Sequence, residues 1–317
     1  MSILQIGAEE VRERLPMPAC IEVMETAMRA LSAGHFEAPM RRVSPLDGGH
    51  FFLMPGAMAN GPVFGAKLVS LMPGNPQREL PAVQGFIALF DHQTGSPLAL
   101  VDGASVTYLR TAAASAMATR SLARPEASSH GIFGAGVLAM EHLHSVSCVR
   151  DIALTRIWAR DQEKAKRFAA KASRETGLVV EAASPEEAAA CDIVSVVTDA
   201  SEPVLQGHWL NPGCHLNLVG AHDPARREAD SDAVSRASIF VDTLAGALAE
   251  SGDILIPMNE GRFAKNAIRG EIGQVLAGDV AGRRDGQEIT LFKSLGHVAQ
   301  DLYAAEIVYR RVMEDRR

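Results

Sequence analysis

The spacing of hydrophobic residues divides the chain into two parts with different patterns. Residues 20–36 have the spacing of an amphipathic helix that stops at Gly34, and residues 85–103 predict a strand, a Gln-Thr-Gly turn and a second strand. Beyond about residue 114, short apolar strands alternate with helical segments. Strands that are apolar almost throughout and alternate with helices predict a parallel sheet covered on both faces.

The second part is expected to form a doubly wound domain. Ser184 is a plausible N-cap of one of its helices, with Pro185 as the first helical residue. The tail from residue 289 begins as a strand and becomes a long amphipathic helix, which we expect to return to the first part. The strands expected in the second part are residues 130–133, 152–159, 178–183, 192–198, 215–221 and 238–242.

A glycine-rich loop follows the first of these strands. Gly134, Gly136 and Ala139 have the GxGxxA spacing: the first allows a tight turn, the second lets the backbone approach a pyrophosphate, and the third lets helix and strand pack closely. The N-terminus of the next helix offers N–H groups to phosphates. We therefore expect a Rossmann-type dinucleotide site. Its contacts are expected from Gly134, Ala135, Gly136, Val137 and Leu138.

The end of the second strand indicates which dinucleotide is bound. An acid there binds the ribose 2′-hydroxyl of NAD, whereas a basic residue accommodates the 2′-phosphate of NADP. Ala159 stands where the acid is commonest, and Arg160 follows it. We expect NADP(H) to be preferred and NAD(H) to be possible, since a shift of one residue would bring Asp161 to the ribose.

Composition excludes several other classes of function. The net charge of −7 and pI near 5.8 give no attraction to nucleic acid. Four scattered cysteines without a CxxC pair, no secretory leader and no run of 18 apolar residues predict a cytoplasmic protein that is not in a membrane. No metal is expected, because His142 and His144 are two apart on a helix and face different ways.

Segments along nearly the whole chain resemble the ornithine cyclodeaminase/mu-crystallin family. They include "GAKLVSLMPGN", "LRTAAASA", "GIFGAGVLA", "VGAHDPARRE" and "FKSLG", in the order and spacing of that family. The resemblance implies a homodimer whose subunits each combine a Rossmann domain with an α+β dimerisation and substrate domain, the substrate lying at the cleft between them. We place the Rossmann domain at residues 114–293 and the other domain at residues 1–113 and 294–317.

The resemblance also implies a site for a small imino or amino acid. Family members bind the substrate α-carboxylate with basic residues that match Arg41, Lys67 and Arg110. An arginine fork suits a carboxylate, and Lys67 and Arg110 stand among apolar or small residues where an unpaired charge is costly. The alternative is that Arg41 is a surface charge and Lys67 reaches out from its strand. By the same resemblance, residues near the cofactor are Thr111, Thr198, Ser294 and Leu295.

Two positions differ from the cyclodeaminases, which hold the side-chain amine of ornithine with a Glu and an Asp. The matching residues are Phe52 and His222, with Asp223 one residue later. Loss of a charge partner costs several kcal/mol, so ornithine is disfavoured, and an apolar wall that includes Met54 suits a cyclic imine. His222 is either a proton donor or a wall residue. Val83 stands where mu-crystallin has a histidine near the cofactor.

We therefore expect an NAD(P)H-dependent reductase of Δ1-pyrroline-2-carboxylate or Δ1-piperideine-2-carboxylate, with hydride transfer to C2 and L-proline or L-pipecolate as product. Lys67 and His222 are the expected catalytic residues. Three alternatives stay open: ornithine cyclodeaminase, alanine dehydrogenase-type amination of a 2-oxo acid, and a non-catalytic NADPH-dependent binding protein like mu-crystallin.

Overall fold

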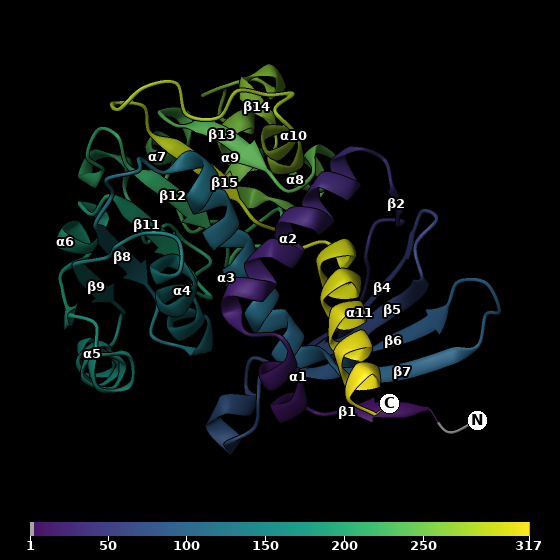
Figure 1. The fold of residues 1–317 in the computed structure, drawn as a ribbon. Coiled ribbons are helices and arrows are strands. Elements are labelled where there is room, and N and C mark those ends of the chain that lie inside the picture. The colour runs from purple at the N-terminus through teal and green to yellow at the C-terminus, as the bar shows by residue number, and fades with distance from the viewer. Residues whose placement is uncertain (1–2, 317) are drawn as a thin grey trace. The chain divides into compact units, whose positions relative to one another are not determined.

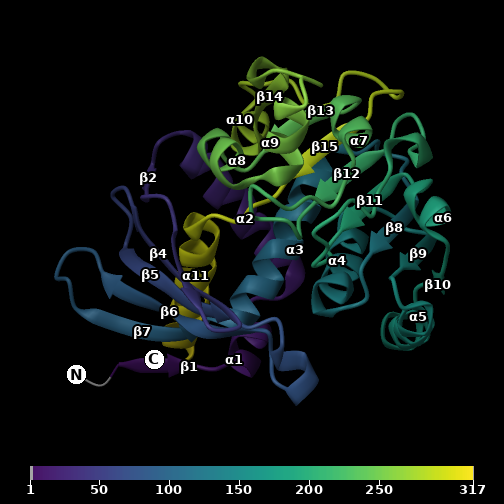
Figure 2. The same cartoon turned by 180° about the vertical axis from the view of Figure 1, so that it is seen from behind.

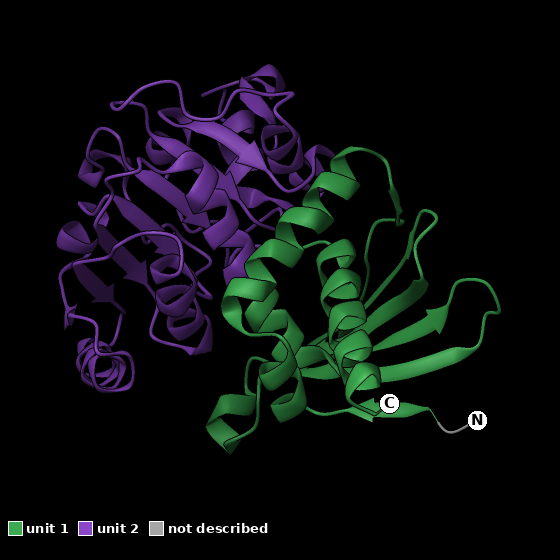
Figure 3. Cartoon of the chain, in the orientation of Figure 1, with its two compact units in different colours: residues 1–110, 296–317 green, residues 111–295 purple. Residues whose placement is uncertain are grey.

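The computed structural model describes residues 3–316, which form two compact units (Figure 3). Unit 1 comprises residues 1–110 and 296–317, and unit 2 comprises residues 111–295. The chain passes from unit 1 to unit 2 within helix α3 (Gly103–Leu122) and returns directly after Leu295. Among the described residues, no helix combines the length and apolar character needed to cross a bilayer.

Unit 1 is built on a seven-stranded mixed sheet. The order is β1-β7-β6-β5-β4-β2, with β3 also paired to β4, and every pair is antiparallel except β1 with β7. The predicted strand–turn–strand is confirmed as β6 and β7. The strands are β1 (Leu4–Ile6), β2 (Phe36–Glu37), β3 (Arg42–Leu46), β4 (Gly49–Met58), β5 (Val63–Leu71), β6 (Val83–Asp91) and β7 (Pro97–Asp102).

The helices of unit 1 pack mainly on one face of this sheet. Helix α2 (Met17–Ser32) confirms the amphipathic helix predicted near the N-terminus, and Gly34 follows it with φ +74°. Helix α11 (Val298–Asp315), yellow in Figure 1, packs against α2 and against β4, β5, β6 and β7. The shorter helices are α1 (Ala8–Arg14) and the 3-10 turn η1 (Asn75–Arg78).

Alternation along the strands gives the sheet two different faces. The inner face carries Lys67, Val69 and Ile87 and lies against α11, since a Cβ at Gly65 on that face would meet Leu302 at 3.2 Å. The opposite face is also apolar and only partly covered. We call it the outer face and define it by Leu53, Pro55, Ala66, Leu68, Phe86, Ala88 and Leu100.

Unit 2 is built on an eight-stranded sheet in which every pair is parallel. The order is β10-β9-β8-β11-β12-β15-β13-β14 (Figure 2), which is the doubly wound Rossmann arrangement that the sequence predicted. The strands are β8 (Ser129–Phe133), β9 (Leu154–Trp158), β10 (Val180–Ala182), β11 (Ile193–Val196), β12 (His215–Leu218), β13 (Ser238–Val241), β14 (Ile268–Glu271) and β15 (Thr290–Lys293).

Two features of this sheet extend the sequence expectation. All six expected strands form, and β15, the strand of the tail, enters the middle of the sheet between β12 and β13. The helix that follows it in the tail, α11, belongs to unit 1. Strand β14 was not predicted, because "IRGE" carries two charged residues and has no apolar run.

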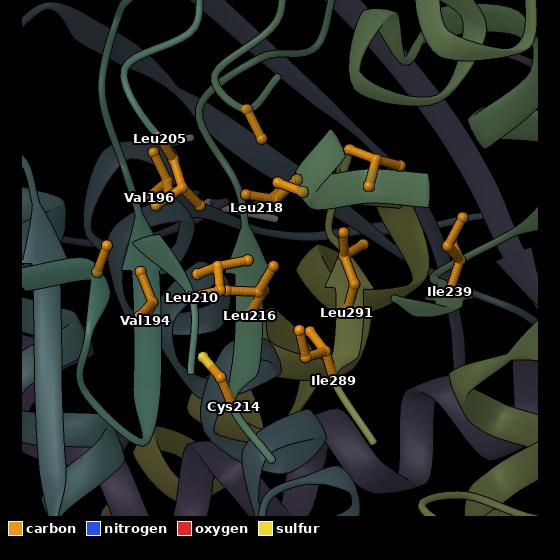
Figure 4. Packing of buried hydrophobic residues seen from close by; sticks show 14 of the residues in the cluster. Val194, Val196, Leu205, Leu210, Cys214, Leu216, Leu218, Ile239, Ile289 and Leu291 are labelled. Atoms are coloured by element: carbon orange, nitrogen blue, oxygen red, sulfur yellow. The ribbon is translucent and has the colours of Figure 1, made fainter. Parts of the chain in front are cut away.

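Helices cover both faces of the sheet of unit 2. Ser184 caps α6 and forms a capping box with Glu187, which confirms the predicted cap. Figure 4 shows apolar side chains of β11, β12 and β15 packed side by side beneath this cover. The helices are α4 (Val137–Ser147), α5 (Gln162–Thr176), α6 (Pro185–Ala189), α7 (Ser231–Ser235), α8 (Leu244–Glu250), α9 (Gly252–Asn259), α10 (Ile272–Ala277), and the 3-10 turns η2 (Gly207–Trp209) and η3 (Lys265–Ala267).

Candidate functional site

The glycine loop of unit 2 has the backbone that the GxGxxA spacing requires. Gly134 has φ +131°, and a Cβ there would lie 3.0 Å from the Val197 carbonyl oxygen. Gly136 precedes α4 as its N-cap, and a Cβ at Gly136 would have no atom within 4 Å. The loop therefore leaves open space directly in front of the helix N-terminus, where a pyrophosphate would bind.

A cavity of about 490 Å³ in unit 2 lies beside this loop. Val137 and Leu138, which begin α4, do not line it, and neither do Thr111 or Ser294. Lys164 lines it and was not predicted. The predicted residues that do line it are Gly134, Ala135, Gly136, Arg160, Asp161 and Thr198.

The residues that follow β9 differ in their contacts at this cavity. The Asp161 carboxylate accepts the N–H of Lys164 at 3.1 Å and is the N-cap of α5. Arg160 is exposed, and both it and Lys164 line the cavity. The cavity edge therefore presents two cations. Of the two carboxylates that line the cavity, Asp161 caps the helix and Asp199 pairs with Arg226.

The ends of β11, β12 and β15 bring three predicted residues, Thr198, His222 and Ser294, to the carboxyl edge of the sheet. Thr198 donates its hydroxyl to Glu228 at 2.7 Å. His222 is half-buried, and its Nδ1 lies 3.1 Å from the Gly220 carbonyl oxygen. Ser294 is buried, and its hydroxyl oxygen has no hydrogen-bond partner within the described residues, which fits a polar ligand group.

Asp223 stands apart from these residues. Its side chain is exposed, and Oδ1 accepts the N–H of Ala225 at 2.8 Å within its own turn. The preceding residue, His222, is half-buried. Among the described residues, no three His, Cys, Asp or Glu side chains group as ligands for a metal ion.

Unit 1 brings two of the predicted basic residues, Lys67 and Arg110, to one carboxylate. Lys67 donates from Nζ to Asp301 Oδ1 at 2.9 Å, and Arg110 donates from Nε to the same oxygen at 3.1 Å. Arg110 also donates to Gln300 Oε1 at 2.9 Å, and Arg41 donates to the Gly296 carbonyl oxygen at 2.9 Å. Lys67 and Arg110 are 2% and 6% exposed, so neither is a surface charge.

The charges in this cluster do not balance. Although burial alone would raise it, the pKa of Asp301 is lowered, because Arg110 and Lys67 lie beside it. Burial lowers the pKa of Lys67 to about 8, against the opposing effect of Asp301, and Arg110 and Arg41 lower it further. Two cations, Lys67 and Arg110, share one carboxylate, which leaves an excess of positive charge that suits an anionic ligand group.

Apolar side chains continue the same sheet face beside these cations. Met54 is paired directly opposite Lys67, and Phe52 lies two residues earlier on β4. Both are buried, at 6% and 8% exposed. A ligand held by the cations would therefore meet apolar carbon on the inner face.

The sequence did not predict Asp301, the buried carboxylate that accepts from Lys67 and Arg110. Asp301 lies on the stripe of α11 that also buries Leu302, Ala305 and Val308, so a charged residue on an apolar helix face was the available signal. Glu228, Asp253 and Lys293 are also fully buried, and none of them was predicted as a site residue.

The model of the Ornithine cyclodeaminase/mu-crystallin family matches residues 4–316. The chain belongs to this family. A Δ1-pyrroline-2-carboxylate reductase of Bacillus cereus, a family relative, is 35% identical over 317 residues, which cover 98% of this chain and 97% of the relative. The resemblance inferred from the sequence motifs is confirmed.

Two solved structures have the same fold as this family member. The Δ1-pyrroline-2-carboxylate reductase of Thermococcus litoralis, in complex with NADH and L-proline, superposes with a TM-score of 0.96 and 36% identity, covering 99% of this chain and 98% of its own. An archaeal alanine dehydrogenase dimer with bound NAD superposes with a TM-score of 0.94 and 30% identity, covering 100% and 98%.

Proposed function

We propose that this chain is an NAD(P)H-dependent reductase of cyclic imino acids, with Δ1-pyrroline-2-carboxylate as substrate and L-proline as product. The observation that carries the proposal is the buried pair of Lys67 and Arg110, which share the single carboxylate of Asp301. Its excess positive charge suits an α-carboxylate, and the apolar side chains beside it suit ring methylene groups. Relatives named for this reaction align along the whole chain.

The residues of unit 1 would bind and orient the substrate. Arg110 offers a planar fork to the carboxylate, and Lys67 adds a point charge whose own counter-ion, Asp301, is already shared with Arg110. Phe52 and Met54 would contact the ring. A side-chain ammonium finds no carboxylate at Phe52 or His222, so ornithine is a poor substrate for this arrangement.

The residues of unit 2 would bind the dinucleotide and supply the proton of the imine nitrogen. Gly134–Gly136 and the start of α4 receive the pyrophosphate, and the Ser294 hydroxyl is available to a polar group of the cofactor. Bound NAD(P)H supplies the hydride that bonds to C2 of the imine. The π electrons of C2=N then pass to the nitrogen, which keeps the proton that His222 supplies.

NADP(H) is the preferred dinucleotide in this proposal. Arg160 and Lys164 place two positive charges at the cavity edge where a 2′-phosphate would lie. Asp161, the alternative ribose ligand, is engaged as the N-cap of α5. NAD(H) would lack the phosphate contacts and bind more weakly, though the relatives of known structure contain NADH or NAD.

The protein would act as a homodimer that buries the outer face of unit 1. Leu68 is paired with Leu53 on one side and Phe86 on the other, and Phe86 is 41% exposed. A contiguous apolar sheet face of this kind marks an interaction surface. The related alanine dehydrogenase is a dimer in its structure.

The deciding experiment follows oxidation of NADPH, and then NADH, by the purified protein with Δ1-pyrroline-2-carboxylate. We expect turnover with the imine, faster with NADPH, and loss of that turnover in Lys67→Met while NADPH binding is retained. Ornithine without added cofactor, and pyruvate with ammonia, are measured in parallel. Ammonia release from ornithine would contradict the proposal, and so would dinucleotide binding with no turnover on any of these compounds.

A further inference from the structure

Glu228 is a buried carboxylate in unit 2 to which the proposed reaction assigns no role. It is 0% exposed, and its Oε1 accepts both the N–H and the hydroxyl of Thr198 at 2.7 Å. Its Oε2 accepts the N–H groups of Gly220 and Ala221. Thr198 follows β11 and Gly220 follows β12, so one carboxylate holds the loops at the ends of two neighbouring strands.

A buried ion pair adjoins Glu228 and the loop that follows β12. Asp253 Oδ1 accepts the N–H of Glu228 at 2.8 Å, and Asp253 Oδ2 accepts from Lys293 Nζ at 2.8 Å. Lys293, the last residue of β15, also donates to the Ala221 carbonyl oxygen at 2.6 Å. Both side chains are fully buried. The network therefore joins the ends of β11, β12 and β15, which are adjacent in the sheet.

The two loops are also joined by direct contact. A Cβ at Gly220 would lie 2.0 Å from the Thr198 carbonyl oxygen, so no side chain fits between them. Arg226 donates to the Asp199 carboxylate at 2.7 Å and links the same loops at the surface. The segments at Thr198 and Gly220 therefore behave as one body whose position depends on Glu228.

We propose that Glu228 is a positioning residue, which fixes the backbone of residues 198–200 and 220–222 and so sets the dinucleotide affinity of the cavity and the placement of His222. The inference rests on the proposed function, which assigns these loops to the cofactor and to the proton. The Thr198 hydroxyl donates to Glu228 and accepts the N–H of Ala200 at 3.2 Å. The hydroxyl of Thr198 is therefore engaged within the protein, and Thr198 affects a bound ligand through the position of its backbone.

Only a carboxylate of this length satisfies the arrangement. Four donors converge on two oxygens, and a glutamine would turn an NH₂ group toward one pair of them. Burial and the Asp253 carboxylate of α9 raise the pKa of Glu228 to about 7, while Lys293 of β15 and the Thr198 donors oppose them. The hydrogen bonds from Thr198 and the charge of Lys293 therefore favour the Glu228 anion, against the larger effect of burial.

Asp192 provides a matched control at the opposite end of β11. Its carboxylate also accepts loop donors, namely the N–H groups of Ser128 and Ser129 at 3.0 and 3.1 Å and the Ser129 hydroxyl at 2.8 Å. Asp192 precedes β11, whereas Thr198 follows it. Glu228→Gln and Asp192→Asn therefore each remove a carboxylate that accepts loop donors. Asp192 is half-buried and also pairs with Arg124, and only Glu228 lies at the carboxyl edge where ligands bind.

The experiment measures NADPH dissociation constants by fluorescence titration without imine, together with melting temperatures and the steady-state constants for imine. We expect Glu228→Gln to raise the NADPH Kd by about tenfold or more, since it leaves buried N–H groups without an acceptor. The KM for imine should change by less than about threefold, because the residues of unit 1 that bind the substrate carboxylate are intact. Asp192→Asn should lower the melting temperature but change the NADPH Kd by less than about twofold.

Equal Kd values for folded Glu228→Gln and the wild type would overturn the inference, and so would an equal rise in Asp192→Asn. If Glu228→Gln does not fold, Glu228→Asp, which keeps the charge but retracts both oxygens, is measured against the same criteria. A wild-type protein that binds NADPH without reducing the imine would contradict the proposed function alone, because the Kd comparison does not depend on turnover.

Discussion

Lys67 and Asp301 form a buried ion pair in unit 1, with 2.9 Å between Nζ and Oδ1. The same oxygen also accepts from Arg110, while Asp301 Oδ2 has no hydrogen-bond partner within residues 3–316. Of the two cations that share this carboxylate, Lys67 is the one that loses its charge when the pH rises above about 8, because burial lowers its pKa to about 8. Arginine has no comparable dependence, because its pKa lies above the range where proteins are studied.

We expect the affinity for L-proline to fall as the pH rises through about 8. Only the protonated form of Lys67 attracts the carboxylate, so binding weakens by up to about tenfold per pH unit above the pKa of Lys67. The measurement is calorimetric titration of the NADP⁺ complex with L-proline between pH 6 and pH 9.5, a range chosen to bracket that pKa at about 8. Lys67→Arg is the control, and a decline of the same size in that variant would assign the titration to another group.

Arg160 and Asp161 are neighbours in sequence with separable effects. We expect Arg160→Ala to lower kcat/KM for NADPH by about tenfold or more, the cost of a charge-assisted hydrogen bond, and to leave the NADH value within about twofold. Asp161→Ala should remove the N-cap of α5 and reduce the free energy of unfolding by about 1 kcal/mol, without altering the ratio of the two cofactors. A large loss of NADH binding in Asp161→Ala would show that Asp161 holds the ribose.

The sequence predicted the elements of unit 2 better than the pairings within the candidate site. Apolar strands such as residues 193–196 are buried on both faces, so their composition, together with their alternation with helices, predicted a parallel sheet. Lys67 and Asp301 are 234 positions apart, and no local pattern connects residues at that separation. The basic residues were found from their apolar surroundings and from family motifs, whereas their buried carboxylate partner depends on how α11 packs on the sheet.

The outer face of unit 1 gives a prediction about assembly. Leu68 lies near its centre between Leu53 and Phe86, so a charge there would have to be buried in the proposed dimer. We expect Leu68→Lys to convert a dimer into a monomer in sedimentation or light-scattering measurements. Val179→Lys, at an apolar residue of unit 2 that is 61% exposed, is the control and should stay dimeric. A monomeric wild type at micromolar concentration would rule out the proposed interface.

Three histidines are buried within unit 2 and make its stability sensitive to acid. His130 and His215 both pair with Ile193, in one row of the sheet, and bond to Ser195 and Thr290 hydroxyls at 3.0 Å. Burial lowers the pKa of each of these two imidazoles to about 3. His142 on α4 bonds to the Ser115 hydroxyl at 2.9 Å, and burial lowers its pKa to about 4.

These depressed pKa values fix the sign of the pH dependence. Between about pH 6.5 and pH 4 the unfolded chain binds protons at these histidines and the folded chain does not, so the free energy of unfolding falls as the pH falls. Each histidine contributes up to about 1.4 kcal/mol per pH unit, or about 4 kcal/mol per unit for three. Urea denaturation at several pH values measures this slope, and His130→Asn should reduce it by about one third. His208 is exposed, so an equal reduction in His208→Asn would show that the slope does not arise from the buried histidines.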